Sequence, residues 1–220
     1  MSNQSLTIWG VGTTRTFRVH WMLHELGIDY DTKRIESRTG ETTAPDYTAL
    51  NPKQKIPLLV HDDLVLGESF AIIHYLRSLS DSLPLDSYQR SVTGKAKFDE
   101  WLSFILMELD ATSLYVVRRH KDLPEIYGEA PAAIDSSIEY FKRMLNSVAN
   151  QITRDRPIWG SRFSELDILM TGVLDWAMFI GITLPAHIVA YQETMRSRTA
   201  YQLAFKHNFR DLQIPAIRDS

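Results

Sequence analysis

The stretch KIPLLVHDDLVLGESFAIIHYL, from Lys55 to Leu76, decides how the rest of the chain is interpreted. It predicts a short strand over Pro57 to Val60, a polar turn and a second strand over Leu64 to Leu66. A helix follows, because apolar residues from Ala71 to Leu76 recur at the spacing of one helical face.

An acid and a hydroxyl stand side by side where this helix begins. Glu68 and Ser69 follow Gly67, and a serine in this place can cap free backbone N–H groups. Unpaired N–H groups and the helix dipole both point outward at a helix N-terminus, so the position favours an anion. Taken alone, a Glu-Ser pair is also a common structural cap.

The pair Ile56-Pro57 opens the first of these strands. Proline is tolerated at the first residue of a strand. We expect a cis peptide bond here, which would turn Ile56 outward and leave its backbone free to pair with an extended ligand. Prolines also open strands for structural reasons alone, so this signal gains weight only beside Glu68 and Ser69.

Composition limits the classes of function. The chain has 220 residues, of which 44% are hydrophobic and 23% charged, and a net charge of −3. These values are ordinary for a globular protein with one large or two modest cores, and they lack the basic footprint of a nucleic-acid binder. The absence of cysteine excludes disulfides, a cysteine nucleophile and thiolate metal sites, and the seven histidines show no metal-ligand spacing.

Targeting signals are not evident in the sequence. Residues 1–5 lack a basic region, and no apolar segment reaches the roughly 18 residues of a membrane span. We therefore expect a cytoplasmic protein with no membrane partner.

Before the opening stretch, the sequence predicts a strand, a helix and a second strand. The strand covers Leu6 to Trp9, the helix runs from about Arg15 to a stop at Gly27, and the second strand covers Ile28 to Ile35. The βαβ order makes these two strands parallel neighbours.

After the opening stretch, the sequence predicts helices alone. Residues 81–87 contain proline and polar residues and are typical of a linker. Apolar periodicity then predicts helices within 88–120, 131–153, 165–181 and 186–207. The third is apolar on nearly every side, so we expect it to be central and buried, with Ser164 and Asp167 forming a capping box at its start.

Two motifs carry a resemblance to a known family. NPKQKIPLLV over residues 51–60 and GESFAIIHYL over 67–76 resemble the glutathione-binding half of the cytosolic glutathione transferases of bacterial, serine- or threonine-type. The resemblance implies an α/β plus all-α protein: a thioredoxin-like domain over residues 1–80, the linker 81–87, and an all-helical domain over 88–220. It also implies glutathione as co-substrate, no metal, and a homodimer.

The resemblance assigns roles to residues. Glu68 would pair with the α-amino group of glutathione, Ser69 would receive its α-carboxylate, and Ile56 would exchange backbone hydrogen bonds with the cysteinyl residue. The full set implied to bind glutathione is Thr42, Gln54, Lys55, Ile56, Pro57, Glu68 and Ser69.

The thiolate of glutathione would lie over the turn after the first strand. Thr14 falls where serine-type members place their catalytic hydroxyl, and Thr16 is the second candidate. A hydroxyl donor would lower the thiol pKa by roughly one to two pH units. The alternative is that Thr14 merely caps the helix, and its extra methyl group restricts the hydroxyl rotamer.

A hydrophobic second substrate would enter between the domains. The candidates that wall its site are Trp101, Met107, Thr112 and Tyr115. The simpler interpretation is that the apolar members of this set belong to the core.

The implied function is conjugation of the glutathione thiolate to a small electrophile. Two alternatives remain at this point: a glutathione-dependent disulfide reductase or peroxidase, and a non-catalytic binding module that keeps the transferase fold.

Overall fold

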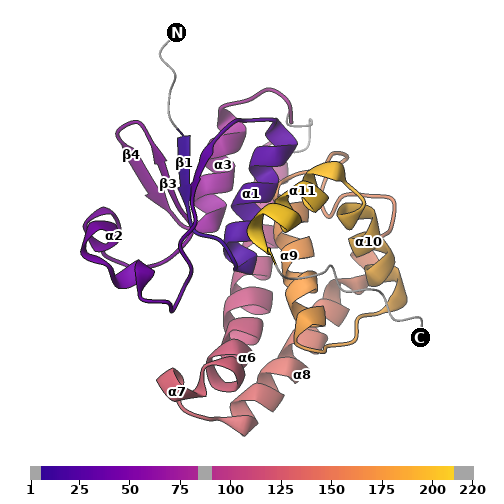
Figure 1. The fold of residues 1–220 in the computed structure, drawn as a ribbon. Coiled ribbons are helices and arrows are strands. Elements are labelled where there is room, and N and C mark those ends of the chain that lie inside the picture. Colours follow the sequence, from indigo (N-terminus) through magenta and orange to yellow (C-terminus); the bar gives the residue numbers. More distant parts are fainter. Residues whose placement is uncertain (1–5, 84–90, 211–220) are drawn as a thin grey trace. The chain divides into compact units, whose positions relative to one another are not determined.

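The computed structural model describes residues 6–83 and 91–210, which form two compact units (Figure 1). The first unit comprises the described residues up to 83 together with residues 197–210. The second comprises residues 91–196. The final helix therefore belongs with the first unit, which corrects the predicted division that kept all of 88–220 in one helical domain.

A four-stranded sheet forms the centre of the first unit. Its strands are β1 (Leu6–Trp9), β2 (Asp31–Lys33), β3 (Leu58–His61) and β4 (Leu64–Gly67), in the order β2-β1-β3-β4. β1 runs parallel to β2, whereas β3 is antiparallel to both β1 and β4. This mixed sheet, with helices between and after its strands, is the predicted thioredoxin-like fold.

Two longer helices pack together in this unit, α1 (Thr14–Leu26) and α3 (Ser69–Ser78). The short helices η1 (Glu41–Thr43) and α2 (Pro45–Leu50) lie between β2 and β3 in the chain. α1 begins with a capping box in which Thr13 and Thr16 exchange side-chain and backbone hydrogen bonds. It ends at Gly27, whose φ of 64° favours glycine.

The helix α11 (Thr199–Asn208) packs on α1 through aromatic side chains. Tyr201 meets Phe17 and Trp21 edge to face, with ring centroids 5.1 Å and 4.9 Å away. Arg198 adds a bidentate ion pair to the Glu25 carboxylate, at 2.6 and 2.7 Å. Each aromatic pair is worth about 0.5–1.5 kcal/mol beyond the area that it buries. These contacts explain why α11 joins the first unit.

Helices are the only regular secondary structure among the described residues of the second unit. Its longer helices are α5 (Val92–Ser103), α8 (Pro131–Val148), α9 (Glu165–Phe179) and α10 (Ala186–Arg196). Shorter segments are η2 (Phe104–Leu114), α6 (Tyr115–Val117), η3 (Arg118–Asp122), α7 (Pro124–Tyr127) and η4 (Ala149–Gln151).

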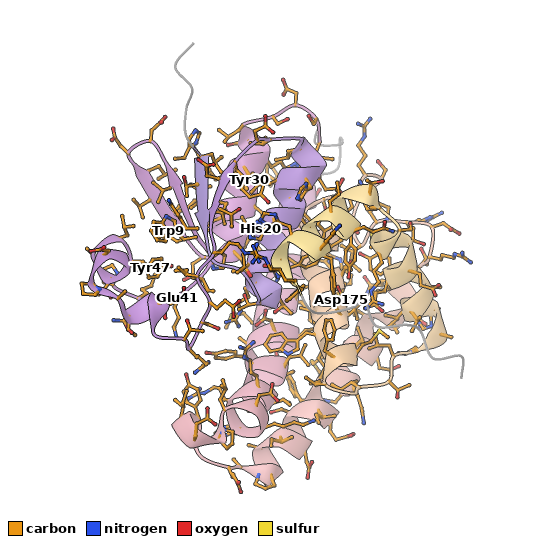
Figure 2. The ribbon with its side chains drawn as sticks, in the orientation of Figure 1. Trp9, His20, Tyr30, Glu41, Tyr47 and Asp175 are labelled. Carbon is orange, nitrogen blue, oxygen red and sulfur yellow. The ribbon has the colours of Figure 1, made fainter. Side chains whose placement is uncertain are left out.

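Helix α9 is the buried centre of this unit, as the sequence predicts. Every residue from Glu165 to Ala177 is buried. The predicted capping box is confirmed, and Asp167 accepts from the N–H of Ser164 at 2.8 Å. Farther along, the carboxylate of Asp175 (Figure 2) pairs with Arg196 of α10 at 2.8 Å, so a buried charge ties the two helices together.

Two predicted elements differ in the structure. The strand predicted over Ile28 to Ile35 is only Asp31–Lys33, the three residues that pair in register with β1. The helix predicted within 88–120 changes to π-helical hydrogen bonding over Phe104–Leu114. Bonds from residue i to i+5 put residues four or five apart on one face, which matches the buried positions Ile105, Leu109 and Leu114.

The predicted linker 81–87 lies mostly outside the described residues, which stop at 83 and resume at 91. None of the helices within 6–83 and 91–210 is long and apolar enough to cross a membrane.

Candidate functional site

The start of α3 carries the predicted acid and hydroxyl. Glu68 is the N-cap residue, with a φ of 68° that is uncommon for a residue with a side chain. Ser69 is buried, and its Oγ lies 3.4 Å from Nη1 of the buried Arg18 on α1. Because the guanidinium only donates, the serine oxygen accepts from it, and the serine proton stays available for an anion.

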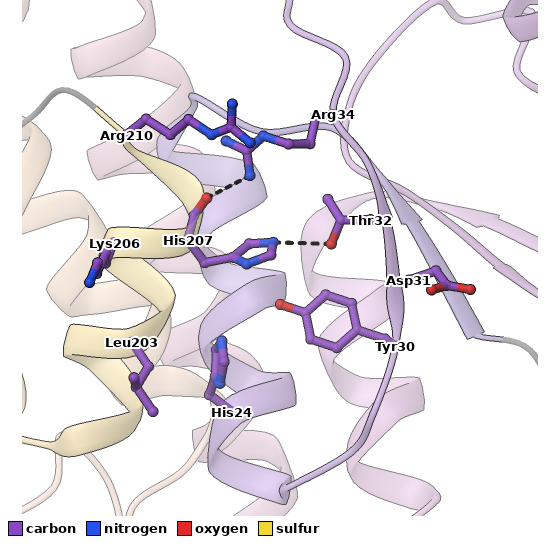
Figure 3. Close-up of a pocket in the computed structure, with 9 residues that line it drawn as sticks. All are labelled: His24, Tyr30, Asp31, Thr32, Arg34, Leu203, Lys206, His207 and Arg210. Carbon is purple, nitrogen blue, oxygen red and sulfur yellow. Dashed lines mark hydrogen bonds between the residues drawn. The ribbon is translucent and has the colours of Figure 1, made fainter.

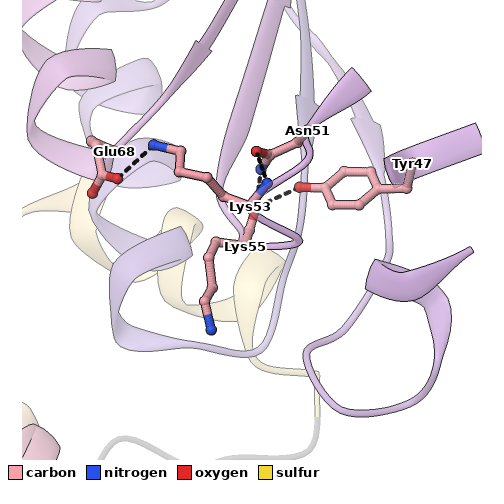
Figure 4. A network of polar contacts seen from close by, with 5 residues as sticks. All are labelled: Tyr47, Asn51, Lys53, Lys55 and Glu68. Carbon is pink, nitrogen blue, oxygen red and sulfur yellow. Dashed lines mark hydrogen bonds and ion pairs between the residues drawn. The ribbon is translucent and has the colours of Figure 1, made fainter. Parts of the chain in front are cut away.

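Glu68 meets a lysine from the loop before β3 (Figure 4). Nζ of Lys53 lies 2.9 Å from Oε1 of Glu68. The two side chains are 60% and 75% exposed, so the pair is worth about 1 kcal/mol or less and opens readily. A ligand with both an ammonium and a carboxylate could therefore exchange partners with Glu68 and Lys53 at little cost.

The loop that carries Lys53 is held by the buried amide of Asn51. Nδ2 of Asn51 donates to the carbonyl of Lys55 at 2.7 Å, and its Oδ1 accepts from the N–H of Lys53 at 3.2 Å. The hydroxyl of Tyr47 donates to the same Lys55 carbonyl at 2.6 Å (Figure 4). The Tyr47 ring lies 5.6 Å from that of Trp9 (Figure 2), which anchors the loop to the sheet.

The Ile56-Pro57 peptide bond is cis, as predicted. Among the described residues, neither the N–H nor the carbonyl of Ile56 has a backbone hydrogen-bond partner. Its side chain packs on Gly10, where an added Cβ would come within 2.6 Å of the Cβ of Ile56. This approach requires glycine and joins the end of β1 to the free backbone edge at Ile56.

A histidine supports the same turn from behind. Nε2 of His20 lies 3.0 Å from the Gly10 carbonyl, and Nδ1 lies 2.9 Å from the hydroxyl of Tyr30. Burial lowers the pKa of His20 to about 3, so the ring is neutral at neutral pH. A carbonyl only accepts, so Nε2 carries the proton and Nδ1 accepts from Tyr30.

The turn after β1 distinguishes the two threonine candidates. Thr13 is the N-cap, so the alternative that Thr14 caps the helix is wrong. Thr14 is the first residue of α1 and half-buried, and its hydroxyl and N–H have no hydrogen-bond partner among the described residues. Both groups are therefore available as donors in the first turn of a helix.

Thr16, in contrast, makes hydrogen bonds within the protein that hold the turn in place. It is fully buried, and its Oγ1 lies 2.7 Å from Oδ1 of Asn208 and 2.8 Å from the carbonyl of Thr13. Since one hydroxyl proton serves these two acceptors, none remains for a ligand. The geometry therefore makes Thr16 a residue that positions the turn, rather than a second candidate for thiol activation.

Gln54, Lys55 and Thr42 are also predicted to bind glutathione, and this role stays a prediction. Gln54 has a φ of 54°, and its Nε2 lies 3.4 Å from Oγ1 of Thr48. The Lys55 side chain is exposed and points away from Glu68 (Figure 4). Thr42 is buried within η1. Lys53, which the sequence interpretation passed over, is the lysine that reaches Glu68.

One of the four residues predicted for a second substrate lines a cavity in the second unit. Trp101 is buried and lines a cavity of about 210 Å³ with Phe104 and Trp159. Met107, Thr112 and Tyr115 are not part of that lining. Met107 is 58% exposed. The role of all four stays a prediction.

Four residues of the site were missed in the sequence: Thr13, Arg18, Lys53 and Asn208. The pattern Thr13-x-x-Thr16 could have identified the cap. No local signal reveals Arg18 or Asn208, because each acts on a residue far away in the chain, at 3.4 Å from Ser69 and 2.7 Å from Thr16. Within the described residues, no group of three or more metal-ligating side chains gathers.

Comparison with known proteins identifies the family to which this chain belongs. Residues 4–78 match the family model of the glutathione S-transferase N-terminal domain. The chain is 30% identical over 183 residues to glutathione S-transferase GstA of Escherichia coli O157:H7, covering 80% of this chain and 82% of that protein. The chain belongs to the glutathione S-transferase family.

Solved structures share the fold over nearly the whole chain. A theta class glutathione S-transferase from Xanthomonas axonopodis pv. citri, with glutathione bound, has a TM-score of 0.76 and 25% identity, covering 91% of this chain and 97% of that one. Yeast Ure2p in complex with glutathione has a TM-score of 0.79 at 19% identity, covering 94% and 95%. At 19% identity, the similarity to Ure2p supports only the assignment of the fold.

Proposed function

We propose that the protein is a glutathione transferase, in which the thiolate of glutathione attacks a small electrophile. The observation that carries the proposal is that three segments meet in the first unit: the start of α1, the Ile56-Pro57 bond and the start of α3. Gly10 packs on Ile56, and Arg18 reaches Ser69, so these segments are joined by direct contacts.

Glutathione would bind along these segments in an extended form. The ammonium of its γ-glutamyl end would pair with Glu68, and the neighbouring carboxylate would accept from the Ser69 hydroxyl and from N–H groups of the first turn of α3. Lys53 lies 2.9 Å from Glu68 and can add a cation to that carboxylate. Ile56 would exchange backbone hydrogen bonds with the cysteinyl residue.

Thr14 would hold the sulfur. Its hydroxyl and N–H have no partner within the described part of the chain, and the dipole of α1 adds positive potential at the same place. A charge-assisted hydrogen bond is worth roughly 1.5–3 kcal/mol, which corresponds to a thiol pKa lower by about one to two pH units. More of the bound thiol is then thiolate at neutral pH.

In the reaction, a lone pair of the sulfur forms the new bond to the electrophilic carbon. The leaving group departs with its bonding electrons, and the thiol proton passes to solvent. Trp101, Met107, Thr112 and Tyr115 remain our candidates for contact with the electrophile. We also propose a homodimer, on family membership, which sedimentation of the purified chain would test.

A panel of electrophiles tests the proposal and separates it from its alternatives. We expect turnover with glutathione and an aryl halide or an isothiocyanate. Faster turnover of mixed disulfides or hydroperoxides would favour the reductase or peroxidase. Binding of glutathione without turnover of any of these would favour the non-catalytic module, and absence of glutathione binding would refute the proposal altogether.

A further inference from the structure

A second pocket, separate from the site above, opens on the first unit beside β2 (Figure 3). It has a volume of about 630 Å³, and its walls come from the last turns of α1, from residues 30–34 and from the end of α11. These elements are all in the first unit.

Side chains alternate between the two faces of β2, and one face supplies most of this wall of the pocket. Tyr30, Thr32 and Arg34 are two residues apart and share one face, whereas Asp31 and Lys33 belong to the opposite face. Figure 3 agrees: Tyr30 and Thr32 point toward α11, and the carboxylate of Asp31 points away from it. Asp31 is the only acidic residue in the described lining, so the pocket is short of negative charge.

Positive charge gathers on the remaining walls. Arg34, Lys206 and Arg210 are cations at neutral pH, and His24 and His207 can become cations. Lys206 and Arg210 are exposed, and within the described residues neither has an ion-pair or hydrogen-bond partner. Nothing on the described walls neutralises these two side chains.

Two of the groups are held in position by hydrogen bonds. Nε2 of His207 lies 3.0 Å from Oγ1 of Thr32, and Nη1 of Arg34 donates to the His207 carbonyl at 2.9 Å (Figure 3). This leaves the other N–H groups of the Arg34 fork without a partner among the described residues. On the facing wall, Nε2 of His24 is buried and has no hydrogen-bond partner in the described part of the chain.

The pKa of His207 responds to the neighbouring positive charges, whereas that of His24 responds to burial alone. Burial and then the cation of Arg34 lower the pKa of His207, with further lowering from His24 and Arg210. Burial likewise lowers the pKa of His24. Tyr30 adds no charge, because burial raises its pKa to about 12. A bound anion would offset the repulsion between His207 and the neighbouring cations.

We propose that this pocket binds a phosphate group, carried either by a soluble phosphorylated compound or by a phospholipid headgroup. A phosphate offers several strong acceptor oxygens, which suit the fork of Arg34 beside His207, and Lys206 and Arg210 add positive charge at the same pocket.

Calorimetric titration of the full chain with inorganic phosphate and with pyrophosphate, at constant ionic strength, tests the proposal. We expect one saturable site. Lys206→Gln and Arg210→Gln should each weaken it about fivefold or more, as expected for loss of one charge contact worth about 1 kcal/mol. Lys33→Gln is the matched control, because it removes the same charge from the opposite face of β2, and it should leave binding unchanged.

Nuclear magnetic resonance of the histidine rings supplies a local readout. Saturating phosphate should raise the pKa of His24 and His207, whereas the ring signals of His61 and His120, which lie outside the pocket, should not move when phosphate is added. Cosedimentation with phosphatidylcholine vesicles containing phosphatidic acid distinguishes the sources. Vesicle binding that Lys206→Gln weakens and Lys33→Gln does not identifies a lipid headgroup, and binding of soluble phosphate alone identifies a soluble compound.

Absence of saturable binding to phosphate, pyrophosphate and vesicles would overturn the proposal. Equal weakening by Lys33→Gln and Lys206→Gln would also overturn it, because net charge rather than this pocket would then account for binding.

Discussion

Asn208 is predicted to couple the end of α11 to the turn that presents Thr14. Its side chain is 2% exposed, accepts from the Thr16 hydroxyl at 2.7 Å and donates to the Thr13 carbonyl at 3.1 Å. Asn208→Ala removes both hydrogen bonds, each worth about 1 kcal/mol net. Thr16 is not left unpaired, because its hydroxyl also lies 2.8 Å from the Thr13 carbonyl.

The expected loss of unfolding free energy is therefore about 2 kcal/mol, or a Tm lower by roughly 4–8 °C for a chain of this length. Urea unfolding should show a lower midpoint with an unchanged slope. Asn146→Ala, on the exposed side of α8, is the matched control and should change stability by less than about 0.5 kcal/mol. A loss no larger than that of the control would refute the coupling.

Two other predictions concern ligand binding and pH. Ser69→Ala should weaken glutathione binding by about 1.5–3 kcal/mol, and Glu68→Gln by about 1 kcal/mol because that carboxylate is exposed; calorimetry with unchanged affinity in both variants would remove glutathione from the start of α3. The pKa of His20 is lowered in the folded protein to about 3, so below pH 6.5 only the unfolded chain takes up this proton. Stability should therefore fall with decreasing pH, this histidine contributing about 1.4 kcal/mol per pH unit. His20→Gln should reduce the slope measured in urea between pH 6.5 and 5, and an unaltered slope would contradict the assignment.

Local sequence signals predicted the parts of the fold that depend on local chemistry. The strands around Leu58 and Leu64, the cis bond before Pro57 and the capping box at Ser164 each rest on neighbouring residues, and the structure confirms them. The glutathione S-transferase family was also predicted correctly, because two of its motifs stand close together around Pro57.

The features that were not predicted depend on contacts between residues far apart in the chain or on backbone conformations that local sequence patterns do not reveal. A helix within 186–207 was predicted, but α11 packs on α1, about 180 residues away, and a local pattern does not identify a distant partner. The contact of Lys53 with Glu68 was not predicted, because the two residues are 15 positions apart in the chain. The π-helical hydrogen bonding over Phe104–Leu114 was also not predicted, because apolar residues spaced three and four apart are typical of an α-helix.

Thr14→Val is the variant that tests the central claim, that the Thr14 hydroxyl holds the thiolate of glutathione. Valine keeps the shape of threonine and removes only the hydroxyl donor, so glutathione should still bind nearly as well. Thr14→Ser keeps the donor and should retain the wild-type thiol pKa.

The most direct measurement is ultraviolet titration of the thiolate of bound glutathione against pH. The account predicts a thiol pKa higher by about one to two pH units in Thr14→Val than in the wild type and in Thr14→Ser. An equal thiol pKa in all three proteins, or the absence of a thiolate signal in the wild type, would contradict the claim.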